Sequence, residues 1–193
     1  MENENFKSNY FKLNSNVDKY NCKSAIEILN DAILKTPNDP DLYRERGRAK
    51  YFQKYYFVEN NPKKGFSAIY SNDFGKMYGN EKYQDVIDDY NMALELNPND
   101  ALCYLYMADT MNTIEDKNLC FDAAIQVNPN FIDAYDKKIG ENIDFRRFPI
   151  AIEAMKLMIK NNPKNKQAKN LFSSYKYFLG KTYETYENYY DKS

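Results

Sequence analysis

The stretch YQDVIDDYNMALELNPND, residues 83–100, decides the fold of this chain. Its apolar residues recur at the three- and four-residue intervals of one helix face, and Ala93 places a small side chain on that face. Pro98 cannot continue a helix and biases Asn97 away from helical conformation, so the helix is expected to end there. Asp100 is expected to be the N-cap of the helix that follows this turn. The stretch therefore predicts one helix, a tight exit turn and the start of another helix.

The same pattern surrounds three other prolines, and its spacing is regular. Pro163 follows Pro129 by 34 residues, a period typical of stacked helical hairpins. The four prolines are Pro37, Pro98, Pro129 and Pro163; eight residues before them stand Leu29, Tyr90, Phe121 and Met155, five before them Ala32, Ala93, Ala124 and Met158, six after the first three Tyr43, Tyr104 and Tyr135, and ten after all four Gly47, Ala108, Ile139 and Ser173. Small residues at helix crossings let two backbones approach closely, so these positions predict the packed core.

A bulky residue, a small residue four later, then an Ala and a second bulky residue before an Asn-Pro stop together resemble the tetratricopeptide repeat. The resemblance covers about residues 20–178. It implies an all-α fold, an α-solenoid of antiparallel helix hairpins that forms a TPR-like superhelix of about 4–5 repeats. We therefore predict that residues 1–193 form a single repeat domain.

The pattern predicts about nine helices and no sheet, with residues 6–20 as a divergent first helix before the eight regular ones. The helices are expected at about residues 21–35, 41–55, 81–97, 100–112, 115–128, 131–142, 149–161 and 165–179. Residues 1–20 keep aromatic and aliphatic side chains but lack the small residue of the repeat, so they are a divergent N-terminal segment. Residues 165–193 are expected to supply a C-terminal capping helix and a Tyr-rich tail. The expected N-caps are Asp39, Asp100, Asn130 and Asn165.

One segment interrupts the repeat. Pro37 and Pro98 are 61 residues apart, 27 more than the distance from Pro129 to Pro163. The excess falls in residues 56–80, whose Gly, Pro, Asn and Ser content predicts an inserted loop. Either it is a tolerated insertion whose aromatic residues pack on the array, or it is a lid over a binding site.

Composition excludes several classes of protein. Twenty-seven basic and 28 acidic residues give a net charge of −1, which argues against nucleic acid as the main partner. No apolar run has the length of a signal peptide or a membrane span, so a cytoplasmic protein without membrane contact is expected. Cys22, Cys103 and Cys120 are odd in number and lack metal-like spacing, so they are predicted to be reduced core residues.

The sequence offers no catalytic constellation. It contains no His, which removes the usual triads and zinc motifs, and none of its six Gly residues forms a phosphate-binding loop. We interpret the cluster of Asp85, Asp88 and Asp89 as a solvated helix surface. The chain is therefore predicted not to be an enzyme and to hold no cofactor and no metal.

The resemblance implies that the first helix of each hairpin lines a concave groove that binds peptides or protein surfaces. The residues that it places there are Arg44, Arg48, Tyr51, Leu105, Tyr106, Asp109 and Lys137. Because Arg and Tyr often dominate interface energy, Arg44, Arg48, Tyr51 and Tyr106 are the expected anchors. The two Arg residues favour an acidic or C-terminal carboxylate ligand, whereas Glu45 and Asp109 argue against a uniformly acidic one. Replacing both Arg residues by Ala is expected to weaken binding about ten-fold with little change in melting.

Some arrays of this family clamp the acidic C-terminus of a chaperone with Lys, Asn and Arg residues on three groove helices. The corresponding residues here are Arg44 and Arg48, then Tyr106, then Asp133 and Lys137. Only fragments of the clamp are present, so chaperone binding is not assigned. The leading hypothesis is a non-catalytic interaction module or scaffold, monomeric or weakly oligomeric, with an unknown protein or peptide partner. The alternative is a structural subunit that self-associates within a larger assembly.

Overall fold

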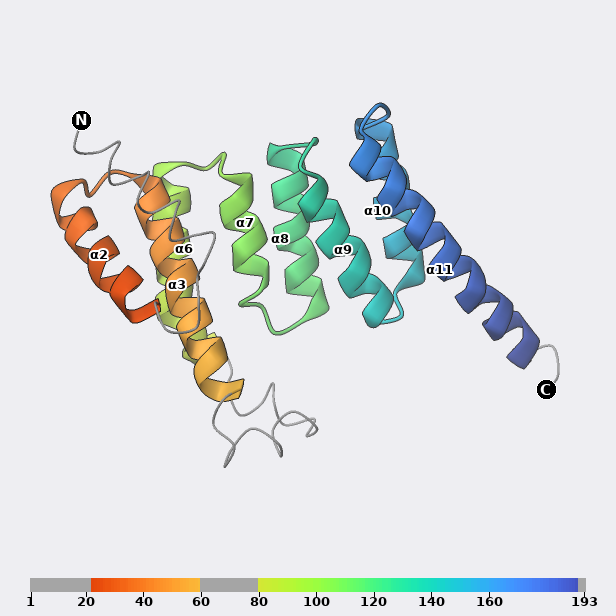
Figure 1. Ribbon diagram of the computed structural model, residues 1–193, viewed down its shortest axis with the longest axis horizontal. Helices are drawn as coiled ribbons and strands as arrows, with labels where there is room; N and C mark the ends of the chain where they lie inside the picture. Colours follow the sequence, from red (N-terminus) through yellow and green to blue (C-terminus); the bar gives the residue numbers. More distant parts are fainter. Residues whose placement is uncertain (1–21, 60–79, 191–193) are drawn as a thin grey trace. The chain divides into compact units, whose positions relative to one another are not determined.

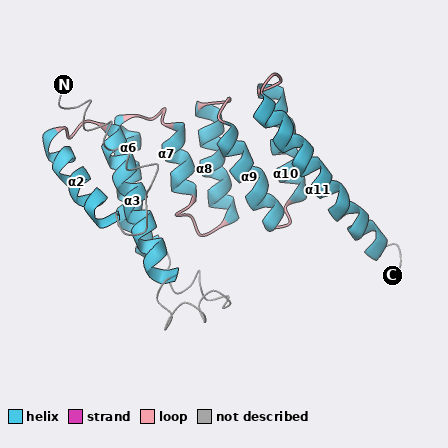
Figure 2. Ribbon diagram, viewed as in Figure 1, coloured by secondary structure: helices cyan, strands magenta, loops and turns pink. Residues whose placement is uncertain are grey.

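The structure, a computed structural model, describes residues 22–59 and 80–190, with side chains described for 22–54 and 82–180. Within these ranges every regular element is a helix (Figure 2), which confirms the predicted all-α fold of tetratricopeptide-like hairpins. The elements are α2 (Cys22–Lys35), α3 (Pro40–Glu59), the 3-10 helix η1 (Asn80–Tyr83), α6 (Gln84–Leu96), α7 (Ala101–Ala108), α8 (Ile114–Val127), α9 (Ile132–Asp144), α10 (Phe148–Asn161) and α11 (Lys166–Tyr190).

The chain divides into two compact units, residues 1–98 and 99–193, each of which is described here by itself. In the first unit α3 packs against both α2 and α6 (Figure 1). In the second, each helix from α7 to α10 packs against the one that follows, and α11 also contacts α9. Both units therefore consist of neighbouring helices in the order that the repeat predicts.

Most of the repeat positions form the core, as predicted, but Tyr43 and Tyr104 are only half-buried and Ser173 is exposed. The bulky residues eight before the prolines and the small or Met residues five before them are all buried. Ala93, Ala124 and Met158 are 0% exposed. Two of the tyrosines that follow the prolines have a further role, because the hydroxyl of Tyr43 donates to the carbonyl of Pro37 and that of Tyr135 to the carbonyl of Pro129. The Tyr spacing thus ties these two exit turns to the helices that follow them.

Helix starts agree with most of the predicted caps. The Asp100 side chain accepts a hydrogen bond from the Cys103 amide, and Asn165 accepts one from the Ala168 amide. The prediction of Asn130 as a cap is wrong by one residue, because Phe131 is the N-cap of α9 and makes no side-chain bond there. At α8 a cap was missed, since Thr113 accepts from the amide of Asp116.

Several helix ends differ from prediction. Helix α3 continues to Glu59, into the segment 56–80 that was predicted as a loop, and α11 continues to Tyr190 rather than ending near residue 179. Helix α7 ends at Ala108, because the following turn closes with bonds from Thr110 and Met111 to carbonyls three residues earlier. The predictions for residues 1–20 and for the greater part of the insertion lie outside the described residues.

The three thiols are reduced and buried. Cys103 and Cys120 lie on the paired helices α7 and α8, as expected from the sequence. Burial, with a smaller contribution from the Asp116 charge, raises the pKa of the Cys120 thiol to about 11. A thiol with this pKa is almost wholly protonated at neutral pH, so Cys120 is expected to be a packing residue and not a nucleophile.

Candidate functional site

One stripe of α3 carries Arg44, Arg48 and Tyr51, as the sequence predicts. The charges of the two Arg residues are already neutralised by carboxylates of the same helix. The guanidinium of Arg44 donates to Asp41 Oδ1 at 2.8 Å and to Glu45 Oε1 at 3.2 Å. Arg48 Nη1 lies 3.7 Å from the other Glu45 oxygen. The Glu45 side chain is 7% exposed, so its charge is buried between the two guanidinium groups. A carboxylate ligand at this stripe would therefore compete with an internal carboxylate.

Aromatic rings extend this stripe toward η1. The Tyr51 ring lies 5.4 Å from that of Tyr83 and 5.7 Å, edge-on, from that of Phe52. The Arg48 guanidinium stands 5.5 Å from the centre of the Phe52 ring, and the Lys82 ammonium 4.9 Å from that of Tyr83. Cations thus flank three half-buried rings at both ends, an arrangement that cation–π attraction stabilises. These five residues are called the aromatic–cation cluster below.

Burial changes the ionisation of two cluster members. It lowers the pKa of the Lys82 ammonium, with a further decrease from the nearby charge of Lys54. It raises the pKa of the Tyr83 hydroxyl. Both pKa shifts have the same cause: partial burial disfavours the charged form, which is the protonated form of an ammonium and the deprotonated form of a phenol.

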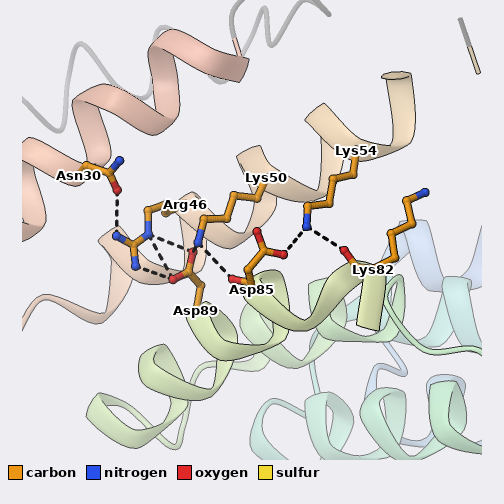
Figure 3. A network of polar contacts seen from close by, with 7 residues as sticks. All are labelled: Asn30, Arg46, Lys50, Lys54, Lys82, Asp85 and Asp89. Atoms are coloured by element: carbon orange, nitrogen blue, oxygen red, sulfur yellow. Dashed lines mark hydrogen bonds and ion pairs between the residues drawn. The ribbon is translucent and has the colours of Figure 1, made fainter. Parts of the chain in front are cut away.

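A ladder of polar contacts holds α3 against α6 beside this cluster (Figure 3). Arg46 donates through Nε and Nη2 to both oxygens of Asp89, the closest contact being 2.5 Å, and Lys50 Nζ lies 2.7 Å from Asp89 Oδ2. Farther along, Lys54 contacts the carboxylate of Asp85 and donates to the carbonyl of Lys82 at 2.8 Å. The ladder fixes the rotation of α3 and so the direction in which the stripe of Arg44, Arg48 and Tyr51 faces.

The ladder corrects one interpretation drawn from the sequence. Asp89 is 4% exposed and is not part of a solvated surface. Arg46 and Lys50 occupy repeat positions that are usually apolar, and Asp89 supplies the matching charge on the facing helix. The sequence did contain a signal for this contact. Arg46, Lys50 and Asp89 are charged residues at core-facing positions of two helices that the repeat pattern pairs.

In the second unit, two predicted site residues meet. Lys137 Nζ on α9 lies 3.4 Å from the Asp109 carboxylate that follows α7. Burial raises the pKa of Asp109, and the charge of Lys137 partly offsets this. A second pair lies close by, where Lys117 of α8 donates to both oxygens of Glu141 at 2.9 Å. Charged groups from the two helices α8 and α9 thus gather around Asp109.

The structure does not support every predicted site residue equally. Tyr106 is half-buried on α7, but Leu105 is 7% exposed and packs in the core of the second unit, so it is not available to a ligand. The three residues on α3 belong to the first unit and the other four to the second. Phe52, Lys82 and Tyr83 were not among the predicted site residues.

The described residues place further limits on the chemistry. Helices long and apolar enough to cross a bilayer are not found in residues 22–59 and 80–190. Over the same ranges, Cys, Asp and Glu nowhere gather in the threes that could hold a metal ion.

Comparison with known proteins gives distant relatives. The chain is 26% identical over 153 residues to Hsp70-Hsp90 organizing protein 3 of Arabidopsis thaliana, covering 75% of this chain and 25% of the relative. It is 24% identical over 171 residues to the Hsp70-Hsp90 organizing protein of Triticum aestivum, covering 81% and 27%. The chain spans about a quarter of the length of the curated relatives it matches. No family model matches it.

Proposed function

We propose that this chain is a non-catalytic protein-interaction module that binds a peptide or protein surface. The first contact surface is the stripe of α3 with its aromatic–cation cluster. The second is formed by Tyr106 on α7, Asp109 just after α7 and Lys137 on α9. The cluster is the observation that supports this most strongly. It presents Arg and Tyr side chains, the types that most often dominate interface energy, on a helix held rigid by the Asp89 ladder.

The similarity to Hsp70-Hsp90 organizing proteins makes Hsp70 and Hsp90 the first partners to test. Their binding is a proposal for this chain, because the similarity is distant and covers a quarter of the relatives' length. Because Glu45 already neutralises the charges of Arg44 and Arg48, we favour a ligand that stacks on the aromatic rings over one whose carboxylate must pair with these two Arg residues. We also expect a cytoplasmic location, where such partners occur.

The proposal can be tested with the double variant Arg48→Ala/Tyr51→Ala. Arg44 would still contact Glu45, so the helix is expected to remain folded. Binding to purified Hsp70 and Hsp90 would be measured by calorimetry, and partners captured from cells would be quantified by mass spectrometry. Lys156→Ala/Lys160→Ala on exposed positions of α10 is the matched control.

The expected result is about ten-fold weaker binding for the α3 variant, equivalent to about 1.4 kcal/mol, and wild-type binding for the control. If every captured protein binds the α3 variant as tightly as it binds the wild type, the α3 stripe is not the binding surface.

A further inference from the structure

Tyr106 and Asp109 lie one turn apart at the C-terminal end of α7. Residues three apart on a helix are neighbours on its surface, so the ring and the carboxylate belong to one face. Tyr106 is half-buried, and the side chain of Asp109 is 31% exposed. Lys137 of α9 reaches this carboxylate across the surface, and its side chain is 51% exposed. A ligand in solution can therefore approach both the carboxylate and its internal partner.

The charge of Asp109 is only partly compensated. Burial raises the pKa of its carboxyl, although the charges of Lys137 and Lys117 lower it. Lys117 contributes little net charge, because its Nζ donates to both oxygens of Glu141 at 2.9 Å. The Lys137 contact, at 3.4 Å, is longer than the roughly 2.7–2.9 Å of a good charge-assisted hydrogen bond. A further cation beside Asp109 would therefore be stabilised there.

The face of α9 that carries Lys137 is otherwise acidic. Asp133 lies one turn before Lys137 and Asp144 two turns after it, and both are exposed. Neither forms an ion pair within residues 22–54 and 82–180. Asp136, on the adjacent position, accepts a hydrogen bond from an uncharged donor, the hydroxyl of Tyr175, at 2.6 Å. The carboxylates of this face thus lack cationic partners of their own.

Most cations in this part of the chain are engaged in internal ion pairs. Residues 99–147 carry nine acidic and five basic side chains. Four of the five basic side chains contact a carboxylate; the pairs are Lys117–Glu141, Lys137–Asp109, Lys138–Asp122 and Arg147–Glu115. The remaining carboxylates give this region an excess of negative charge, which attracts cationic ligands.

We propose that Tyr106 and Asp109 form a binding site for a Lys or Arg side chain of a partner protein. The carboxylate would pair with the incoming cation, and the Tyr ring would contact its alkyl chain or its charged group. Asp133 and Asp144 would attract further basic residues of the same segment. This inference rests on the proposed function, in which Tyr106 and Asp109 belong to the second contact surface, and adds the chemistry of the ligand.

Other ligands fit this site less well. A calcium ion takes six or more oxygen ligands, and in the described part of the chain carboxylates do not gather even in threes. A nucleic acid would bring its phosphates against the acidic excess of residues 99–147. A basic protein segment matches both the carboxylate and the neighbouring ring.

A basic peptide tests the proposal on the full chain. The probe is a rhodamine-labelled peptide of four Ser-Arg repeats with an amidated C-terminus, and the matched neutral peptide has citrulline in place of Arg. Binding is followed by fluorescence anisotropy, and melting curves check that each variant is folded. The test variants are Asp109→Asn and Lys137→Gln. Their matched controls, Asp122→Asn and Lys138→Gln, break another Asp–Lys pair of the same unit and change the net charge equally.

The two test variants should change affinity in opposite directions. Asp109→Asn should bind the Arg peptide at least about ten-fold more weakly than the wild type does. Lys137→Gln should bind it about three-fold more tightly, because a competing cation has been removed. The controls should bind the Arg peptide as the wild type does, and the citrulline peptide should bind more weakly by about ten-fold or more.

Four results would overturn the proposal: no binding of the Arg peptide to the wild type, equal binding of the citrulline peptide, equal losses for Asp109→Asn and Asp122→Asn, or weaker binding by Lys137→Gln. Calcium binding that Asp109→Asn abolishes would overturn it in favour of a metal ion. A wild-type dimer that Asp109→Asn disperses in sedimentation would overturn it in favour of a second copy.

The α3 surface fails by a different result. If Asp109→Asn loses the Arg peptide while every captured protein binds Arg48→Ala/Tyr51→Ala as tightly as the wild type, the α3 surface is wrong and the site at Asp109 stands. If the Arg peptide is lost only with Arg48→Ala/Tyr51→Ala, the site at Asp109 is wrong and the α3 surface stands.

Discussion

Nη2 of Arg46 lies 2.5 Å from Oδ1 of Asp89, although the two residues are 43 positions apart in the chain. The contact joins the helices on either side of the insertion, and Lys50 shares the same carboxylate. Burying a charge is costly unless it is paired, so this pair also favours a single alignment of α3 and α6.

Replacing Asp89 by Asn should destabilise the first unit by roughly 2 kcal/mol. Loss of one partner of a buried pair costs about 3–5 kcal/mol, and the cost is expected to be lower here because Arg46 and Lys50 are both about one-fifth exposed and can reach water. Urea denaturation followed by circular dichroism gives the measurement. Asp88→Asn is the control, since Asp88 is exposed and should change stability by less than about 0.5 kcal/mol. Equal effects at the two positions would contradict the ladder.

Gly47 and Gly180 should respond in opposite ways to Ala. Inside a helix, Gly→Ala normally stabilises by up to about 1 kcal/mol. At Gly47 the new Cβ would lie 2.8 Å from Cε1 of Tyr90, a ring that is 1% exposed and has no room to move, so thermal stability should fall. At Gly180 no described side chain, and no backbone atom outside α11 itself, lies within 4 Å of the new Cβ, and stability should rise. An increase in melting temperature for both variants would show that α3 and α6 do not approach this closely.

The double variant Arg44→Ala/Arg48→Ala should lower the melting temperature. The sequence suggested little change, but the structure buries Glu45 between the two guanidinium groups, and their removal takes two partners from its charge at a cost of about 1–3 kcal/mol. Adding Glu45→Gln to the double variant should restore part of the loss. A double variant that melts like the wild type would mean that Glu45 does not depend on these two Arg residues.

Asp109→Asn should stabilise the protein at neutral pH and weaken partner binding. Because burial raises the pKa of Asp109 in the folded state, the ionised carboxylate opposes folding. Its favourable contribution is complete below about pH 3.9, the ordinary pKa of Asp, and is lost as pH rises through the higher folded value. The gain from Asn should therefore increase between pH 4 and pH 7 in urea titrations. A gain that did not depend on pH would contradict this account of Asp109.

Much of the fold could be predicted because small and bulky side chains recur at fixed positions of the repeat and mark the core. Pro98 and Ala93 define a helix end and a helix crossing by sterics alone, and both predictions hold in the structure. The end of α3 was not predictable in this way. Residues 56–59 precede the Pro and Gly residues of the insertion, so nothing in them stops a helix.

The candidate site was harder to predict, because charge compensation depends on three-dimensional neighbours. Arg44 and Arg48 were placed on the correct stripe, but Glu45 lies between them in sequence and its burial is not visible there. Tyr83 joins Tyr51 only when the chain returns after the insertion. Leu105 was predicted to line the groove because it lies one position from the core stripe, and on a helix as short as α7 that position also packs inward.

Hydrogen exchange, measured by mass spectrometry with and without a captured partner, tests the central proposal most directly. The account predicts that binding slows amide exchange in α3, in η1, in the peptide that contains Asp109 and in the peptide that contains Lys137. Helices α8 and α10 should exchange as in the unbound protein. Protection confined to α2, α8 and α10, with α3 unchanged, would contradict it.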